Sequence, residues 1–139
     1  MGLSVRTMIA QDYDAVMAVW RAAEGVGLSS TDSPEGFVRF LDRNPGLSFV
    51  AVDAGDIVAG VLCGHDGRRG YIHHLAVRPE QRRRGMASML VRRCLEELAS
   101  QGIDKCHLFV FADNEPAIAF WREGGWIQRV DLVVMSHLT

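Results

Sequence analysis

Cysteine is scarce in this sequence, and long apolar runs are absent. The three cysteines are widely spaced and no CxxC pair is present. Disulfide frameworks and cysteine-based zinc or redox sites need paired spacings, so we exclude them and expect a reducing compartment. No stretch approaches the roughly 18 apolar residues that a membrane-spanning helix requires, and residues 1–6 lack the apolar core of a signal peptide. We therefore expect a cytoplasmic protein with no membrane partner.

The chain also lacks a strong excess of either charge. It has 15 lysines and arginines against 17 aspartates and glutamates, a formal net charge of −2. Domains that bind nucleic acid through their overall charge are normally basic. We therefore expect no nucleic-acid partner, although arginines cluster at residues 68–69, 82–84 and 92–93. Any anion must bind at a local site.

Apolar periodicity and turn residues predict one α/β (α+β) domain, residues 1–139. The predicted strands are residues 3–8, 48–53, 57–64, 71–77, 105–111 and a closing pair within 126–137. Helices are predicted after Asp12 as N-cap, from Ser33-Pro34, from Met86 and from Asn114. The order is βααβββαβαββ. We expect a mixed central sheet of about six or seven strands, antiparallel at first and parallel at the later crossover, with helices on both faces.

Three arginines and a glycine, Arg82 to Gly85, join the 71–77 strand to the helix that begins at Met86. A helix N-terminus binds phosphate because its backbone N–H groups are free and its dipole is positive there. Gly85 lets the backbone approach such a group, Ala87 keeps the first turn slim, and Ser88 adds a hydroxyl donor. Taken alone, the cluster is equally consistent with a solvated charge run. The flanking strand and helix favour an anion site.

Two common nucleotide-binding motifs are excluded at this junction. No lysine followed by serine or threonine succeeds Gly85, so a Walker P-loop is absent. The spacing of Gly64, Gly67 and Gly70 is not that of the dinucleotide fingerprint.

Two segments of the chain resemble the signatures of one enzyme family. Residues 75–87, LAVRPEQRRRGMA, resemble the strand, turn and Arg/Gln-x-x-Gly-x-Gly/Ala motif of GNAT N-acetyltransferases. Residues 114–126, NEPAIAFWREGGW, are similar to the family's second signature, Asn-x-x-Ala-x-x-x-Tyr-x-x-x-Gly-Phe. The predicted order of elements also agrees with the family over nearly the whole chain. The resemblance implies the GNAT fold and acetyl transfer from acetyl-CoA to a primary amine of a small molecule or protein.

The resemblance also implies where acetyl-CoA binds. In the family, the strand before the first motif lies along the pantetheine, the following amides hold the pyrophosphate, and an asparagine contacts the cofactor. The matching positions here are Leu75, Ala76, Val77, Arg82, Arg83, Arg84, Gly85, Met86, Ala87, Ser88, Asn114 and Phe120. Asn114 is equally suited to cap the helix that follows it.

The reaction that the resemblance implies is direct attack by a neutral amine on the thioester within a ternary complex. A backbone N–H near Leu75 is expected to polarise the carbonyl. His73 and His74 are candidate bases because imidazole titrates near neutrality, and His73 is preferred because it aligns with positions that carry a base in some relatives. Adjacent strand residues face opposite ways, so we expect the two histidines to diverge and to bind no metal.

Trp121 departs from the family pattern, which has a tyrosine there to protonate the leaving thiolate. An indole N–H donates a hydrogen bond but does not release a proton. We therefore expect Trp121 to form a cleft wall beside the thioester or, equally, to be a core aromatic. Tyr71, water or the amine's own proton would then protonate the thiolate. The same departure makes a non-catalytic acyl-CoA binding module the alternative function.

The resemblance implies that the acceptor enters beside the connection between the first two helices, here residues 25–32, whose glycines are typical of a mobile lid. The turn that contains Asp66, Arg68 and Arg69 is dense in functional groups. If both arginines face the cleft, the acceptor carries a carboxylate as well as an amine, and Asp32 and Asp66 would hold its ammonium group. An aspartate–glycine pair is also good turn chemistry. The sequence is compatible with a homodimer and with a monomer.

Overall fold

The computed structural model describes residues 2–139. The chain divides into two compact units, one ending at Phe109 and the other comprising residues 110–139. Each unit is described by itself. The first contains the sheet and three of the four α-helices of the described chain.

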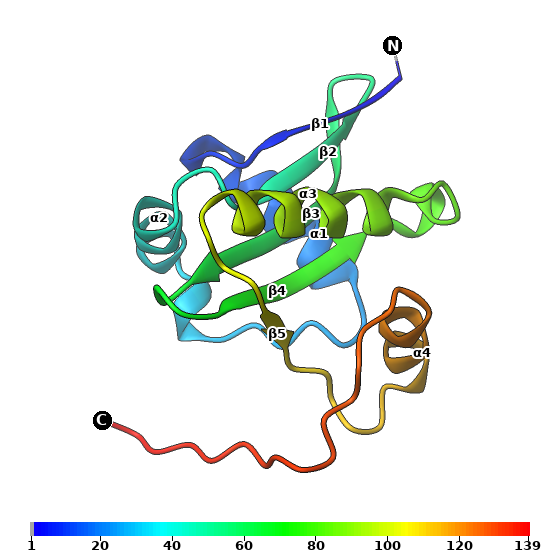
Figure 1. Cartoon of the computed structure of the whole chain (residues 1–139). Helices are drawn as coiled ribbons and strands as arrows, with labels where there is room; N and C mark the ends of the chain where they lie inside the picture. The colour runs from blue at the N-terminus through cyan, green and yellow to red at the C-terminus, as the bar shows by residue number, and fades with distance from the viewer. Residues whose placement is uncertain (1) are drawn as a thin grey trace. The chain divides into compact units, whose positions relative to one another are not determined.

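A five-stranded sheet forms the centre of the first unit (Figure 1). The strands lie in sequence order: β1 (Leu3–Thr7), β2 (Phe49–Asp53), β3 (Asp56–His65), β4 (Gly70–Val77) and β5 (Cys106–Leu108). Strands β1 to β4 pair antiparallel, and β5 pairs parallel with β4. The expected mixed sheet is confirmed, with five strands in the described residues rather than six or seven.

Helices cover both faces of this sheet, as predicted. The helices of the first unit are α1 (Tyr13–Ala22), α2 (Pro34–Arg43) and α3 (Met86–Ser100), with single 3-10 turns at Ala10–Asp12, Ser30–Asp32 and Pro79–Gln81. Helices α1 and α3 pack on opposite faces (Figure 1). Helix α2 lies on the α1 side, where the ring of Phe37 meets that of Trp20 edge-on at 6.3 Å. Ser33 caps α2 as predicted and accepts the Gly36 N–H at 3.1 Å.

Asp12 precedes α1 but does not cap it with its side chain, contrary to the prediction. Its carboxylate accepts two hydrogen bonds from the Arg6 guanidinium, at 2.8 and 2.9 Å, and one from the Ile9 N–H at 2.9 Å. Burial alone would raise the pKa of the Asp12 carboxyl. The bonds from Arg6 and Ile9 outweigh burial and leave this pKa below its ordinary value. The Asp12 side chain thus ties β1 to the start of α1.

Gly60 on β3 allows α1 to approach the sheet closely. A Cβ at this position would lie 2.8 Å from Cγ2 of Val16 and 3.8 Å from Nε1 of Trp20. Both side chains are fully buried, and Trp20 Nε1 donates to the Gly60 carbonyl at 3.3 Å. We expect Gly60→Ala to lower the free energy of unfolding by about 1–3 kcal/mol, because the overpacked helix must shift. Urea unfolding measures this difference, and an unchanged midpoint and slope would contradict it.

The second unit contains one α-helix among its described residues, α4 (Glu115–Glu123). Asn114 caps this helix and accepts the Ala117 N–H at 3.2 Å. The ring of Trp121 lies edge-on to those of Phe120 and Trp126, with centroids 5.1 and 5.0 Å away. No helix within residues 2–139 has the length and apolarity needed to cross a membrane.

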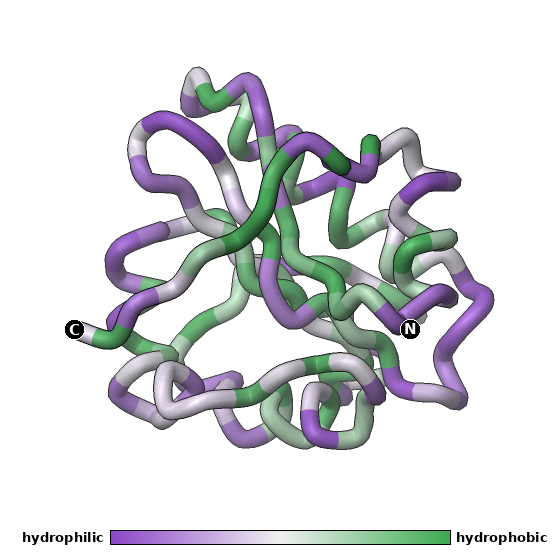
Figure 2. Tube along the Cα trace, turned by 90° about the horizontal axis from the view of Figure 1, so that it is seen from below, coloured by the Kyte–Doolittle hydropathy of each residue, from purple (hydrophilic) through white to green (hydrophobic). Residues whose placement is uncertain are grey.

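The closing strand pair predicted within residues 126–137 does not form, and no strand occurs in residues 126–139. Figure 2 shows a hydrophobic stretch just before the C-terminus. The large apolar side chains of this segment are exposed, from 57% for Leu132 to 95% for Leu138. Such apolar and β-branched residues have a high β-propensity. That propensity yields a strand only where a neighbouring strand supplies hydrogen bonds and packing, and no described strand pairs with this segment.

Candidate functional site

The edge of β4 is free over its second half. Strand β5 pairs with β4 only as far as Ile72, opposite Leu108, whereas β4 continues to Val77. This divergence also makes β5 shorter than the predicted 105–111. Leu75, Ala76 and Val77 therefore have no strand partner on that side among the described residues. A free strand edge offers backbone N–H and C=O groups to an extended ligand, in the manner of an added strand.

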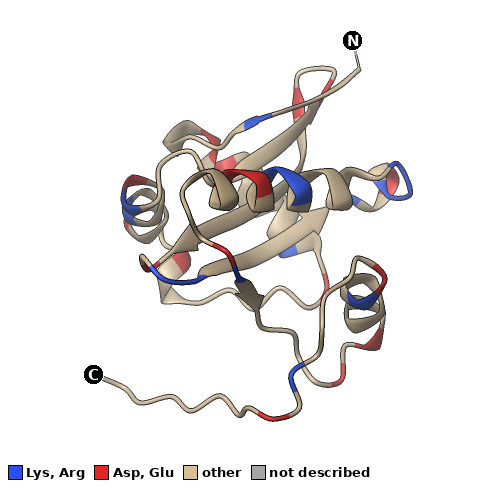
Figure 3. Ribbon diagram, in the orientation of Figure 1, with Lys and Arg blue, Asp and Glu red and all other residues tan. Residues whose placement is uncertain are grey.

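The exposed turn between β4 and α3 is rich in free N–H donors. Arg83 and Gly85 have left-handed backbones, with φ of 66° and 77°. Gly85 is the N-cap residue of α3, where no side chain caps the helix. Among the described residues, no acceptor takes the backbone N–H groups of residues 83–87. Basic residues gather at this turn (Figure 3). The partial positive charges of the free N–H groups thus lie close to the full charges of the arginines, a combination that suits a pyrophosphate.

The side chains around this turn have different roles. Arg84 Nη1 donates to Asp53 Oδ2 at 3.0 Å and to Gln81 Oε1, which ties the turn to the end of β2. Within residues 2–139 the guanidinium groups of Arg82 and Arg83 have no such acceptor. The remaining predicted cofactor residues differ in exposure: Met86 is buried in the core, Ala87 is half-buried and Ser88 is exposed. Met86 therefore offers only its backbone to a cofactor.

A bulge in β4 brings the two histidines together. The pairing register with β3 shifts between Gly60 and Leu62, and His74 has a φ of 55°, which is uncommon for a residue other than glycine. Bulges change the direction in which side chains point. The rings of His73 and His74 lie 6.5 Å apart, edge to face. The prediction that the two histidines diverge is therefore wrong, because the bulge cancels the alternation of a regular strand.

His73 belongs to a row of aromatic rings along β4 and β5. It stacks on Tyr71 at 6.5 Å and meets Phe40 of α2 edge-on at 5.9 Å. Tyr71 also lies beside the rings of His107 and Phe109, at 5.8 and 6.3 Å. This row positions the His73 ring by packing, since no hydrogen bond within residues 2–139 holds it.

The electrostatic surroundings of His73 favour its neutral form. Burial is the largest cause that lowers its pKa, and the neighbouring His74 lowers it further. The Asp32 carboxylate acts in the opposite direction, but the net pKa of His73 lies below its ordinary value. His73 is therefore a neutral imidazole with an available lone pair at pH 7.

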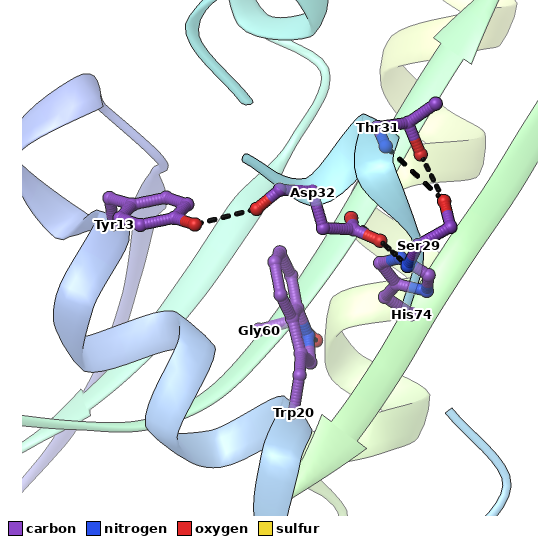
Figure 4. A network of polar contacts seen from close by, with 7 residues as sticks. All are labelled: Tyr13, Trp20, Ser29, Thr31, Asp32, Gly60 and His74. Atoms are coloured by element: carbon purple, nitrogen blue, oxygen red, sulfur yellow. Dashed lines mark hydrogen bonds and ion pairs between the residues drawn. The ribbon is translucent and has the colours of Figure 1, made fainter. Parts of the chain in front are cut away.

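His74 is held by Asp32, from the connection between α1 and α2 (Figure 4). Its Nε2 lies 2.9 Å from Asp32 Oδ1. The other carboxylate oxygen accepts the Ser29 N–H at 2.9 Å, and the Asp32 carbonyl accepts the Tyr13 hydroxyl at 2.6 Å. The ring of Trp20 meets the ring of His74 edge-on at 5.2 Å. Three segments of the chain thus converge on one aspartate–histidine pair.

Sequence reasoning did not find this pair. Asp32 and His74 are 42 residues apart, and no local pattern marks a bulge at His74. The connection predicted as a lid at residues 25–32 ends in a 3-10 turn, Ser30–Asp32, that is joined to the sheet through this contact.

The hairpin turn between β3 and β4 is held by its own residues. Asp66 Oδ1 accepts the N–H groups of Arg68 and Arg69 at 2.8 and 2.9 Å, and these bonds lower the pKa of the Asp66 carboxyl. Arg69 also lies 3.5 Å from Asp104. The structure thus shows Asp66 in the turn-forming role. Asp32 was predicted to hold the acceptor's ammonium group together with Asp66, and its carboxylate is paired with His74. No group of three or more His, Cys, Asp or Glu side chains within residues 2–139 is arranged to hold a metal ion.

Known proteins with related sequences and folds are acetyltransferases. The model of the Acetyltransferase (GNAT) family matches residues 13–126. An acetyltransferase of Pectobacterium atrosepticum is 34% identical over 122 residues, which cover 87% of this chain and 85% of that protein. The fold is similar to that of Ard1 from Thermoplasma volcanium, with a TM-score of 0.80 at 20% identity, covering 91% and 84% of the two chains. It is also similar to PaiA N-acetyltransferase from Thermoplasma acidophilum in complex with coenzyme A, with a TM-score of 0.77 at 15% identity and 89% coverage of both chains.

Proposed function

Because the chain belongs to the GNAT acetyltransferase family, we propose that it transfers an acetyl group from acetyl-CoA to a primary amine of a small molecule or protein. The observation that carries this proposal is the free edge of β4, which the turn of residues 78–85 connects to the uncapped N-terminus of α3. An extended ligand with a pyrophosphate fits such an edge and such a helix end. The family match crosses both compact units, which supports a single acetyltransferase domain.

The main cofactor contacts that we propose come from the free groups of β4 and of the α3 N-terminus, and the family signature adds Asn114 and Phe120. Leu75, Ala76 and Val77 would bond the pantetheine with their backbones, since this edge of β4 has no strand partner. The amides of residues 83–87 would hold the pyrophosphate, helped by the guanidinium groups of Arg82 and Arg83. Asn114 caps α4 with its side-chain oxygen, so a cofactor contact from this residue would use its amide nitrogen. We also propose that Phe120 contacts the cofactor.

The chemistry needs a polarised thioester carbonyl and a proton acceptor. Acetyl-CoA supplies the activated acetyl group, and the Leu75 N–H next to the bulge would donate to the developing oxyanion. His73 would take a proton from nitrogen as the C–N bond forms, because it is neutral at pH 7. Either His73 would return that proton to the departing sulfur, or Tyr71, which stacks on His73, would donate its hydroxyl proton to the sulfur and recover one from His73. Trp121 would contribute shape rather than a proton.

Thiol release from acetyl-CoA across a panel of amines tests this function. The panel includes peptides with a free α-amine, lysine and polyamines, each compared with a reaction that lacks amine. We expect release that depends on the amine and yields one acetylated amine per thiol. Binding of acetyl-CoA without thiol release from any amine would contradict the proposal and would favour a non-catalytic acyl-CoA binding module.

A further inference from the structure

The pair formed by His74 and Asp32 has no part in the proposed chemistry described above, although it has the construction of a proton-accepting unit. Asp32 is buried, with 8% of its surface exposed. Its two carboxylate oxygens are fixed by His74 and by the Ser29 N–H. A base whose ring is oriented by a carboxylate is a recurrent arrangement in proton-transfer sites. No carboxylate among the described residues hydrogen-bonds the His73 ring and orients it in this way.

The backbone at His74 supports a role beyond packing. It is the only residue other than glycine in a described strand with a positive φ. A residue other than glycine is strained in this conformation, and such residues gather at functional sites. The bulge turns the His74 ring toward the α1 side, where Trp20 contacts its edge and Asp32 reaches its Nε2.

The second ring nitrogen of His74 is not fully buried, although only 16% of the His74 side chain is exposed. Asp32 accepts from Nε2, so the lone pair of the neutral ring lies on Nδ1. Nδ1 has no hydrogen-bond partner among residues 2–139, and no buried side-chain nitrogen or oxygen in those residues lacks a partner. Nδ1 is therefore accessible and available as a proton acceptor.

Acetyl transfer from a protonated amine removes two protons from nitrogen. One must leave the ammonium before attack, and the other leaves after the C–N bond forms. A neutral imidazole accepts one proton, and His73 has that role in the proposed reaction. If the acceptor binds as an ammonium ion, its first proton needs a second acceptor; an acceptor that binds as the neutral amine has already lost that proton to solvent.

We propose that His74, held through Nε2 by Asp32, takes the proton from the ammonium group of the acceptor so that the neutral amine can attack the thioester. This role rests on the proposed acetyl transfer. The C–N bond forms, the C–S bond breaks, and the second proton passes by way of His73 to the coenzyme A sulfur. The proton on His74 returns to solvent from the accessible Nδ1. The balance is ammonium plus thioester giving amide, thiol and one released proton.

The titratable groups around His74 come from three segments. Asp32 contacts it from the α1–α2 connection, and Tyr13 of α1 bonds the carbonyl of Asp32. His73 lies next to it on β4. Strand β3 faces the bulge with apolar residues only, between Gly60 and Leu62. The Asp32 carboxylate is therefore the counter-charge of the imidazolium that forms during the transfer.

The pH dependence of kcat/KM separates this role from a structural one. His74→Asn keeps a polar side chain that tolerates the left-handed backbone, but it removes the proton acceptor. For an α-amine with a pKa of about 8, we expect a loss of about 30-fold at pH 6.5 and less than about twofold at pH 9, because the variant uses only the neutral amine. For a lysine amine near 10.4, the loss stays above about 20-fold at pH 9. Asp32→Asn should give the same pH-dependent pattern.

His65→Asn is the control for the His74 variant. His65 bonds Gln101 and the Gly67 N–H at the other end of β3, and His65→Asn should match the wild type at every pH. A His74→Asn rate equal to wild type, or reduced by the same factor at every pH, would overturn the proton-accepting role while leaving acetyl transfer intact. No thiol release by the wild type with any amine would instead overturn the proposed function, and this role with it.

Discussion

Gly85→Glu is expected to abolish measurable binding of acetyl-CoA without unfolding the protein. Nothing lies within 4 Å of a Cβ at Gly85, so the added Cβ meets no clash, and the substitution costs only the backbone strain of a φ of 77°. Its carboxylate would stand where the free amides of residues 83–87 would hold the pyrophosphate. Two unit charges 4 Å apart near a protein surface repel by about 4 kcal/mol, which corresponds to an affinity loss on the order of a thousandfold.

Gly102→Glu is the matched control for this substitution. Gly102 follows the other end of α3, has a φ of 83° and also has open space around its Cβ position. The two variants therefore share the added charge and the backbone strain. Titration calorimetry should record wild-type affinity for Gly102→Glu and no saturable heat for Gly85→Glu. Equal affinities in the two variants would show that the α3 N-terminus does not bind the cofactor.

His73→Ala is expected to reduce kcat by about a hundredfold or more while the affinity for acetyl-CoA stays within about twofold. General acid–base catalysis contributes about 10²–10⁴-fold, and the structure gives His73 no role in the β4 edge or in the α3 turn. His73→Phe should lose turnover to the same extent, because it retains the packing against Tyr71 and Phe40 but has no ring nitrogen.

The pH profile of the wild type gives a second test of His73. Its folded-state pKa is lowered, so the neutral base persists below the ordinary value. The decline in kcat/KM that protonation of His73 causes should therefore lie below about pH 6.5, and both His73 variants should lack this contribution to the profile. Retention of turnover in His73→Phe, or an acid limb above pH 7, would rule out His73 as the base.

Local patterns in the sequence predicted most of the elements of the first unit. The apolar periodicity from Met86 to Ser100 gave the bounds of α3, and Ser33-Pro34 gave the start of α2, because capping and periodicity act over a few residues. The local geometry of the turn before α3 was predictable for the same reason, since free amides and a left-handed Gly85 follow from a strand–glycine–helix junction; its binding of an anion stays a prediction.

Features that depend on distant partners were not predictable in this way. The Asp12 carboxylate could accept hydrogen bonds either from the first turn of α1 or from Arg6. It bonds Arg6 because β1 places that guanidinium beside it. The β4 bulge arises from pairing with β3, so strict alternation failed at His74 and the contact with Asp32 was missed. Residues 126–137 have strand-forming composition, but a strand also needs a neighbour, which composition does not specify.

Calorimetric titration of the unmodified protein with acetyl-CoA tests the central claim most directly. The free edge of β4 and the uncapped N-terminus of α3 predict saturable binding at one site per chain. Titration without saturable binding would contradict the assignment of these elements to the cofactor, and with it the proposed acetyl transfer.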